Sequence, residues 1–176
     1  CAPNDKVCLE SNKFMRRLYS QQFPTDCGEG RKYMLCYPFR PYGFASMFHH
    51  VAWCMTVGFA LGRTVIIKSL PHNFINAPDC KNPAFKDAWE CYFQPVTHCV
   101  EPTKPDHPGQ PLKEKWVAGK SERSNAKILY IEYDSIRGHP DEFVYWTDGP
   151  LQAHLKNTGV DVRAWVKGQL VGVCFS

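Results

Sequence analysis

The stretch that decides the fold is RKYMLCYPFRPYGFASMFHHVAWCMTVGFALGRTVII, residues 31–67. Residues 31–37 have the apolar and aromatic content of a buried strand, which two prolines bring to an end. Residues 45–61 are apolar on nearly all sides, which is typical of a buried helix, and Gly62 is well placed to stop it. The β-branched run 64–67 predicts a second strand, so the stretch as a whole predicts a βαβ unit with a parallel pair.

The rest of the chain extends this unit into an α/β fold with an open, mostly parallel sheet and a buried crossover helix. Residues 1–26 are interpreted as an N-terminal helical segment, and residues 27–176 as a single α/β domain. The proline-rich residues 70–126 predict a long, loop-rich excursion, and residues 127–133 predict a third strand. Two helical stretches are expected to close the chain.

Length and charge limit the classes of function. A chain of 176 residues suits one hydrophobic core, and its net charge of +4 is modest. The densest run of Lys and Arg, residues 113–127, is interleaved with glutamates and is typical of a solvated loop. We therefore expect no nucleic-acid partner, and the apolar runs are too short for a transmembrane segment.

The nine cysteines favour disulfides in an oxidising compartment over a metal centre or redox chemistry, because none of them forms a CxxC pair. An odd number leaves at least one thiol that is free or bonded outside the chain. No leader precedes Cys1, so we expect that a signal peptide or anchor was removed.

One loop has the features of a ligand site. In open α/β sheets ligands bind beyond the carboxyl ends of the strands, and the first strand-to-helix turn is 39–46. Gly43 lets the backbone approach a phosphate, and the helix that follows offers free N–H groups to an anion. A single glycine favours a structural turn over a nucleotide-binding loop. His49 and His50 point apart on a helix, which favours hydrogen-bonded core or rim roles over catalysis.

At this loop the sequence resembles a known family. Cys27, the strand RKYMLC (31–36), the segment GFASMFHHVAWC (43–54) and the strand GRTVII (62–67) are similar to the donor-side subdomain of eukaryotic α1,6-fucosyltransferases. These enzymes are related more distantly to bacterial nodulation fucosyltransferases.

The resemblance continues downstream and covers roughly residues 21–172. The pattern WExxFxPVxxC at residues 89–99 is similar to a second family segment almost position for position. Tyr133-Asp134-Ser135-Ile136, followed by His139-Pro140, resembles a third segment, and residues 163–166 lie where the family has a tryptophan-bearing helix.

The resemblance implies a disulfide map. It pairs Cys27 with Cys99 and Cys36 with Cys54. Outside the family pattern, we expect Cys80 to pair with Cys91 and Cys1 with Cys8, which leaves Cys174 as the odd thiol, available to a partner chain.

The resemblance also implies binding residues but no cofactor and no metal. Positions that flank the donor substrate GDP-fucose match Gly43, Phe44, Ala45, Ser46 and Phe74. Positions that hold the acceptor glycan match Arg40 and Asp134.

Catalytic residues are not expected in this chain. The family's basic segment H-x-R-R-x-D-K, which binds the donor phosphates, would follow the last helix, and its nucleotide-binding half is also unmatched. One hypothesis is therefore that the chain is part of a Golgi transferase. Together with a second chain or a C-terminal half, it would move fucose from GDP-fucose to the core of an N-glycan. The alternative is a truncated or pseudoenzyme form, a secreted non-catalytic module that binds glycans or proteins.

Overall fold

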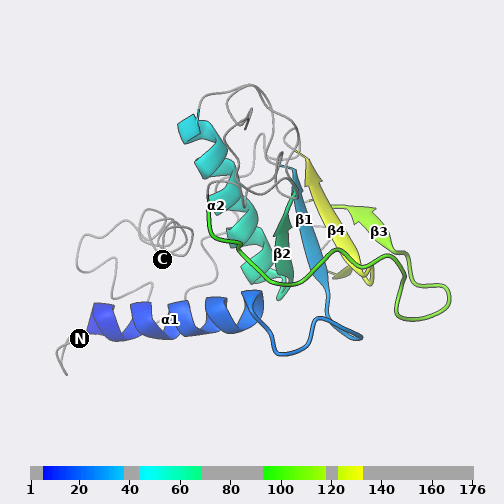
Figure 1. Cartoon of the computed structure of the whole chain (residues 1–176), viewed down its shortest axis with the longest axis horizontal. Helices are drawn as coiled ribbons and strands as arrows, with labels where there is room; N and C mark the ends of the chain where they lie inside the picture. Colours follow the sequence, from blue (N-terminus) through cyan, green and yellow to red (C-terminus); the bar gives the residue numbers. More distant parts are fainter. Residues whose placement is uncertain (1–5, 38–43, 69–92, 118–122, 133–176) are drawn as a thin grey trace.

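The structure is a computed structural model that describes residues 6–37, 44–68, 93–117 and 123–132. Its elements are α1 (Lys6–Gln22), β1 (Tyr33–Tyr37), α2 (Phe44–Ala60), β2 (Thr64–Ile67), β3 (Lys113–Lys115) and β4 (Ile128–Glu132) (Figure 1). The two closing helices expected from the sequence lie outside the described residues.

The four strands form one parallel sheet in the order β2-β1-β4-β3. Tyr33 of β1 is in register with Thr64 of β2 on one side and with Ile128 of β4 on the other. The predicted α/β class, the open parallel sheet and the crossover helix are all confirmed.

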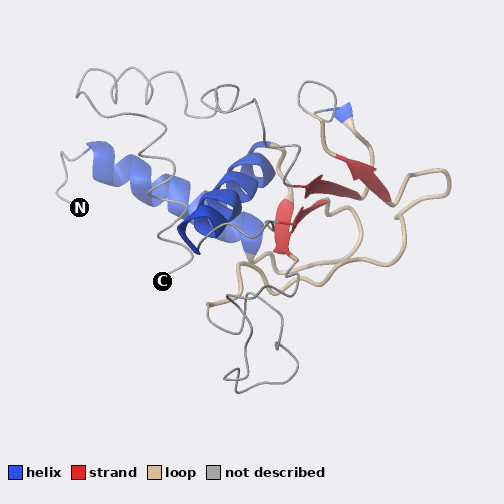
Figure 2. Ribbon diagram, turned by 90° about the horizontal axis from the view of Figure 1, so that it is seen from above, coloured by secondary structure: helices blue, strands red, loops and turns tan. Residues whose placement is uncertain are grey.

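The sheet is buried on both faces, by different kinds of structure. Alternate strand residues pack against α2 on one face and on a loop segment, residues 93–112, on the other (Figures 1 and 2). The strand residues on the α2 face are Met34, Cys36, Val65, Ile67, Leu129 and Ile131. Those on the opposite face are Tyr33, Leu35, Ile66 and Ile128, which pack with Cys99.

The helix α2 ends where the sequence predicts, at Gly62, whose φ is 60°. The N–H of Gly62 donates to the carbonyl of Phe59 at 3.2 Å, and the N–H of Arg63 donates to the carbonyl of Gly58 at 2.8 Å. These are the two bonds of a Schellman cap, in which glycine adopts the left-handed conformation at no steric cost. The cap reverses the chain directly into β2.

Gly58 sets the distance between α2 and the sheet. A Cβ atom at this position would lie 2.1 Å from Cγ2 of Val65 and 3.2 Å from the carbonyl oxygen of Arg63. The close approach explains why a glycine stands inside this mostly apolar helix.

The edge strand β3 was not predicted, because the sequence places its residues inside the loop-rich excursion. Lys113, Glu114 and Lys115 are all exposed and show no apolar alternation. They nevertheless pair in parallel with β4. A short, charged strand is a common way to end a sheet without inviting a further strand.

Two disulfides fix the segments around β1, and both are pairs that the family resemblance implies. Cys27 bonds to Cys99 with a Cα–Cα distance of 5.5 Å, which attaches the loop segment to the start of β1. Cys36 bonds to Cys54 at 5.9 Å, which attaches β1 to α2. Cys8 is also disulfide-bonded. Its expected partner Cys1, the expected pair Cys80–Cys91 and Cys174 lie outside the described residues.

The amino ends of three strands converge on the buried side chain of Arg63, which is 2% exposed. Its Nη1 donates to the carbonyls of Tyr33 at 3.3 Å and Ala126 at 3.0 Å, and its Nη2 donates to that of Ser124 at 3.2 Å. Burial lowers the pKa of Arg63 to about 10, so the guanidinium stays charged at neutral pH. Its bonds hold the start of β2 to the starts of β1 and β4.

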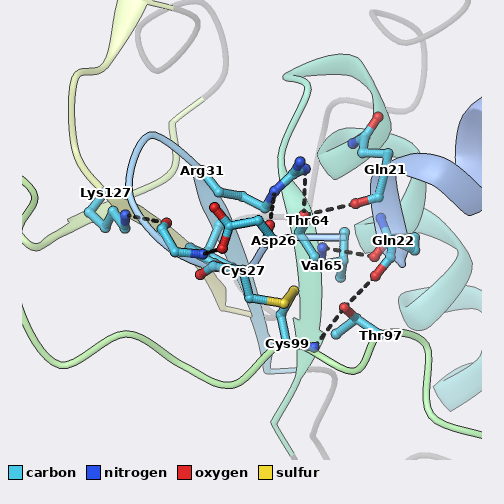
Figure 3. The surroundings of a disulfide bond; sticks show 12 residues. Gln21, Gln22, Asp26, Cys27, Arg31, Thr64, Val65, Thr97, Cys99 and Lys127 are labelled. Carbon is cyan, nitrogen blue, oxygen red and sulfur yellow. Dashed lines mark hydrogen bonds between the residues drawn. A yellow bond between two sulfur atoms is a disulfide. The ribbon is translucent and has the colours of Figure 1, made fainter. Parts of the chain in front are cut away.

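The end of α1 covers the outer edge of β2. The Oε1 of Gln22 accepts from the backbone N–H of Val65 at 3.0 Å, and Thr64 donates through Oγ1 to the carbonyl of Gln21 at 2.8 Å (Figure 3). The Nε2 of Gln21 donates to the carbonyls of Gly58 and Arg63. The last turn of α1 is thus part of the same core, while the domain boundary at residue 26 stays a prediction.

A buried ion pair joins two loops at the same edge. Nζ of Lys127 pairs with Asp106 and also donates to the carbonyl of Gly28 at 3.2 Å. The other carboxylate oxygen of Asp106 accepts from the N–H of Gly30 at 3.1 Å. The hydrogen bond from Lys127 holds the pKa of Asp106 below its ordinary value, and the Gly30 N–H adds to this although desolvation opposes it.

Replacing Gly58 with alanine should destabilise the fold, because the new Cβ overlaps Val65. Overpacking of this kind costs about 1–3 kcal/mol and exceeds the gain of about 1 kcal/mol in helix propensity. Denaturant unfolding should show the loss. Adding Val65→Ala to Gly58→Ala should recover part of the lost unfolding free energy, because it removes the overlapping methyl group. Adding Ile67→Ala instead should lower the unfolding free energy further, by the cost of that substitution alone. Additive behaviour with Val65→Ala would contradict the close approach.

Asp106→Asn should destabilise the protein at neutral pH by leaving Lys127 buried without its carboxylate. A carboxylate with a depressed folded pKa contributes stability that is present above the unfolded pKa of about 3.9 and is lost as the pH falls through the folded value. The difference in unfolding free energy between wild type and variant should therefore narrow below about pH 4. The exposed Glu29, which lies between Gly28 and Gly30, serves as the control: Glu29→Gln should show no such difference from wild type at neutral pH.

Candidate functional site

The strand order places a switch point between β1 and β4. From β1 the chain crosses over α2 to β2 on one side, while β4 lies on the other side of β1. The two strands end together, because Tyr37 and Glu132 are in register. In open α/β sheets ligands bind in the crevice beyond the carboxyl ends of such a strand pair.

The first helix turn adjoins this position. The helix α2 begins at Phe44, seven residues after β1 ends at Tyr37. Its first turn carries no acidic residue, so the positive end of the helix is not neutralised from within that turn. Backbone N–H groups at such a terminus are suited to an anion such as a phosphate.

The Cys36–Cys54 disulfide fixes both ends of the intervening turn. Cys36 is the residue before the end of β1, and Cys54 lies inside α2, where both side chains are fully buried. The strand end and the helix therefore cannot move apart without breaking a covalent bond. A ligand loop carried between them has fixed anchors.

The predicted binding residues fall partly on described elements. Phe44, Ala45 and Ser46 form the first turn of α2, at the expected edge of the sheet. Gly43, Phe74, Arg40 and Asp134 lie outside the described residues. Of the two histidines on α2, His50 is half-buried, in keeping with a rim position.

A charged group on the loop-covered face was missed by sequence reasoning. Glu101 pairs with Lys68 at 2.5 Å through one oxygen and with Lys113 through the other. Partial burial opposes ionisation of Glu101, but hydrogen bonds from Lys113 and Lys68 outweigh it and hold its pKa below the ordinary value. A carboxylate with two cations is a poor general base, so its role is to link the end of β2 to the start of β3. No local pattern in the sequence marks it.

A polar hollow of about 370 Å³ opens at the opposite, amino edge of the sheet. It is lined by Thr25, Asp26, Glu29, Gly30, Arg31, Lys32 and Gly62. Because ligands of open parallel sheets bind at the carboxyl edge, we assign the candidate site to the β1–β4 switch point and not to this hollow.

Within the described ranges, one group of side chains has the composition of a metal site: Cys27, His98 and Cys99. Two of its three ligand atoms are joined in the disulfide, so this form of the chain offers no thiolate there. The described helices also include none with the length and apolar character needed to cross a bilayer.

Comparison with known proteins identifies the family. A profile described as alpha-(1,6)-fucosyltransferase N- and catalytic domains matches residues 5–141. Eight curated proteins match with significance, among them an alpha-(1,6)-fucosyltransferase of Drosophila melanogaster, which is 27% identical over 162 residues. The match covers 92% of this chain but only 23% of that relative, so the chain spans about a quarter of the relative's length. The chain belongs to the alpha-(1,6)-fucosyltransferase family.

Proposed function

We propose that this chain forms the donor-side subdomain of an α1,6-fucosyltransferase-type enzyme, which moves fucose from GDP-fucose to the core of an N-glycan. The observation that carries the proposal is the placement of the first turn of α2 at the carboxyl edge of the sheet, next to the β1–β4 switch point. Residues 27–176 would act as one α/β unit in this role.

The donor would bind at the turn between β1 and α2. Gly43 precedes α2 directly, and Phe44, Ala45 and Ser46 supply the first helix turn. The free N–H groups of that turn suit the negative charge of a nucleotide diphosphate, and the lack of an acidic side chain in the turn leaves that attraction intact. Phe74 would complete the donor site as an aromatic wall.

The acceptor glycan would bind across the switch point, through Arg40 and Asp134. Arg40 follows Tyr37 by three residues and Asp134 follows Glu132 by two, and Tyr37 and Glu132 are in register. The two residues would therefore flank the switch point from its two strands. A guanidinium donates to hydroxyl and carbonyl oxygens and a carboxylate accepts from hydroxyl and amide groups, and a glycan offers all of these.

Catalysis would need a second half of the enzyme. The family's basic segment has no match within residues 1–176, and the proposal assigns to it the stabilisation of charge on the departing GDP. The disulfides Cys27–Cys99 and Cys36–Cys54 support folding in the secretory pathway, in agreement with a site of action in the Golgi lumen. In this proposal Cys174, the odd thiol expected from the sequence, would bond to a partner chain.

Kinetics of the longest native polypeptide that carries this sequence test the site. Asp134→Asn and Arg40→Ala should raise the KM for the glycan acceptor about tenfold or more, the cost of one charged hydrogen bond, and leave the KM for GDP-fucose unchanged. Gly43→Val should raise the KM for GDP-fucose and leave the KM for the glycan acceptor unchanged. Glu29→Gln, at the opposite edge of the sheet, should alter neither constant. Equal effects of Asp134→Asn on both substrates would contradict the assignment.

The transferase and the non-catalytic alternative predict different results for donor binding and for the mass of the native product. If the turn between β1 and α2 binds the donor in this chain, calorimetric titration with GDP-fucose should give saturable binding, and Gly43→Val should weaken it. The intact mass of the native product should exceed that of residues 1–176, or a tightly bound partner should accompany it. A native product that ends near Ser176, stands alone and binds no GDP-fucose would replace the transferase by a secreted binding module.

A further inference from the structure

The side chain of His98 lies beside the Cys27–Cys99 disulfide. The two sulfur atoms and a ring nitrogen of His98 all lie within 4.8 Å of one another. Two thiolates and an imidazole are the ligands that Zn²⁺ prefers, and three protein ligands with one water complete its tetrahedron. No local pattern in the sequence marks this group, because Cys27 is 72 residues from Cys99 along the chain.

The backbone that carries these ligands is held by bonds other than the disulfide. The N–H of Cys99 donates to Oγ1 of Thr97 at 3.1 Å, and that hydroxyl donates to the carbonyl of Gln22 (Figure 3). At the other cysteine of the group, the hydroxyl of Tyr33 donates to the carbonyl of Cys27. The ligand positions therefore have support of their own when the sulfur–sulfur bond is open.

The third ligand is accessible from solvent. His98 is exposed, and its ring lies 5.9 Å from that of Phe23, in a tilted contact. Cys99 is 6% exposed and Cys27 is half-buried. An ion can thus reach the group from the imidazole side.

We propose that reduction of the Cys27–Cys99 disulfide creates a Zn²⁺ site formed by Cys27, His98 and Cys99. A dithiol or phosphine reductant supplies two electrons, the sulfur–sulfur bond breaks, and two protons yield two thiols. Zn²⁺ then binds the two thiolates and the neutral imidazole, and both thiol protons are released to solvent. The site is independent of the proposed transferase reaction.

Exposure makes this disulfide the first of the two described disulfides to be reduced. Cys36 and Cys54 are both 0% exposed, beneath α2, whereas Cys27 is reachable from solvent. Thiol–disulfide exchange requires access of the attacking group to a sulfur atom. Mild reduction should therefore open Cys27–Cys99 while Cys36–Cys54 persists.

The bound metal would take over the task of the disulfide. Cys99 lies on the loop segment 93–112, and Cys27 precedes β1, so a metal between them fastens that segment to the sheet. The chain would then keep this attachment under reducing conditions, in which the covalent bond cannot form.

The test is anaerobic titration of the mildly reduced full chain with Co²⁺ and then Zn²⁺. We expect a thiolate-to-cobalt charge-transfer band and the intense visible bands of a tetrahedral ion, both abolished by one equivalent of Zn²⁺. His98→Ala should weaken Zn²⁺ binding by at least about tenfold, since even residues that only orient a ligand cost about 10–100-fold. His107→Ala, an exposed histidine on the same segment, is the matched control and should bind as wild type.

A second variant locates the sulfur ligands among the nine cysteines. Replacing both Cys27 and Cys99 with serine should abolish the charge-transfer band. Three results would each overturn the proposal: a band that survives in this double variant, His98→Ala that binds Zn²⁺ as tightly as His107→Ala, or octahedral cobalt spectra without thiolate bands. If the reduced chain unfolds, His98→Ala and His107→Ala should bind Zn²⁺ equally tightly, because an unfolded chain does not hold either histidine near the two cysteines.

Discussion

The rest of the structure depends on a constraint of parallel sheets, which need cover on both faces. Within the described chain α2 covers one face together with Leu18, Val96 and Trp116, and an irregular segment, residues 93–112, covers the other. An irregular segment has few regular hydrogen bonds of its own and must be attached from outside. Three kinds of attachment do this: the Cys27–Cys99 disulfide, the Glu101 ion pairs with both sheet edges, and the Lys127–Asp106 pair. Each bonds the segment to a different part of the sheet.

The two edges of the sheet differ in the polar groups that they hold. The amino edge holds the buried guanidinium of Arg63 and the Lys127–Asp106 pair, whose hydrogen bonds are used up within the protein. The carboxyl edge holds the ends of β1 and β4 and the start of α2. The proposed ligand site thus lies at the opposite ends of the strands from these buried polar groups.

The sequence predicted the βαβ unit closely, because each of its signals is local. The apolar residues of 31–37, the all-round apolar helix and the β-branched run at 64–67 each specify one element, and Gly62 separates two of them. The sequence did not predict β3, since its three charged residues show no strand pattern and it is a strand through its pairing with β4. Glu101 and the group of Cys27, His98 and Cys99 were not predicted either, because the residues that interact are distant from one another in the chain. Of the candidate binding residues, only the three at the start of α2 have a described position.

The amide of Gln22 has a consequence for how the sheet can grow. By accepting the N–H of Val65, it occupies a backbone donor that would otherwise face outward from β2, and Thr64 is held to α1 beside it. An edge with its donors taken is a poor template for a strand from another molecule. By taking the Val65 donor, the end of α1 makes this stretch of β2 a poorer template for strand addition, and for the aggregation that follows from it, than a bare edge would be.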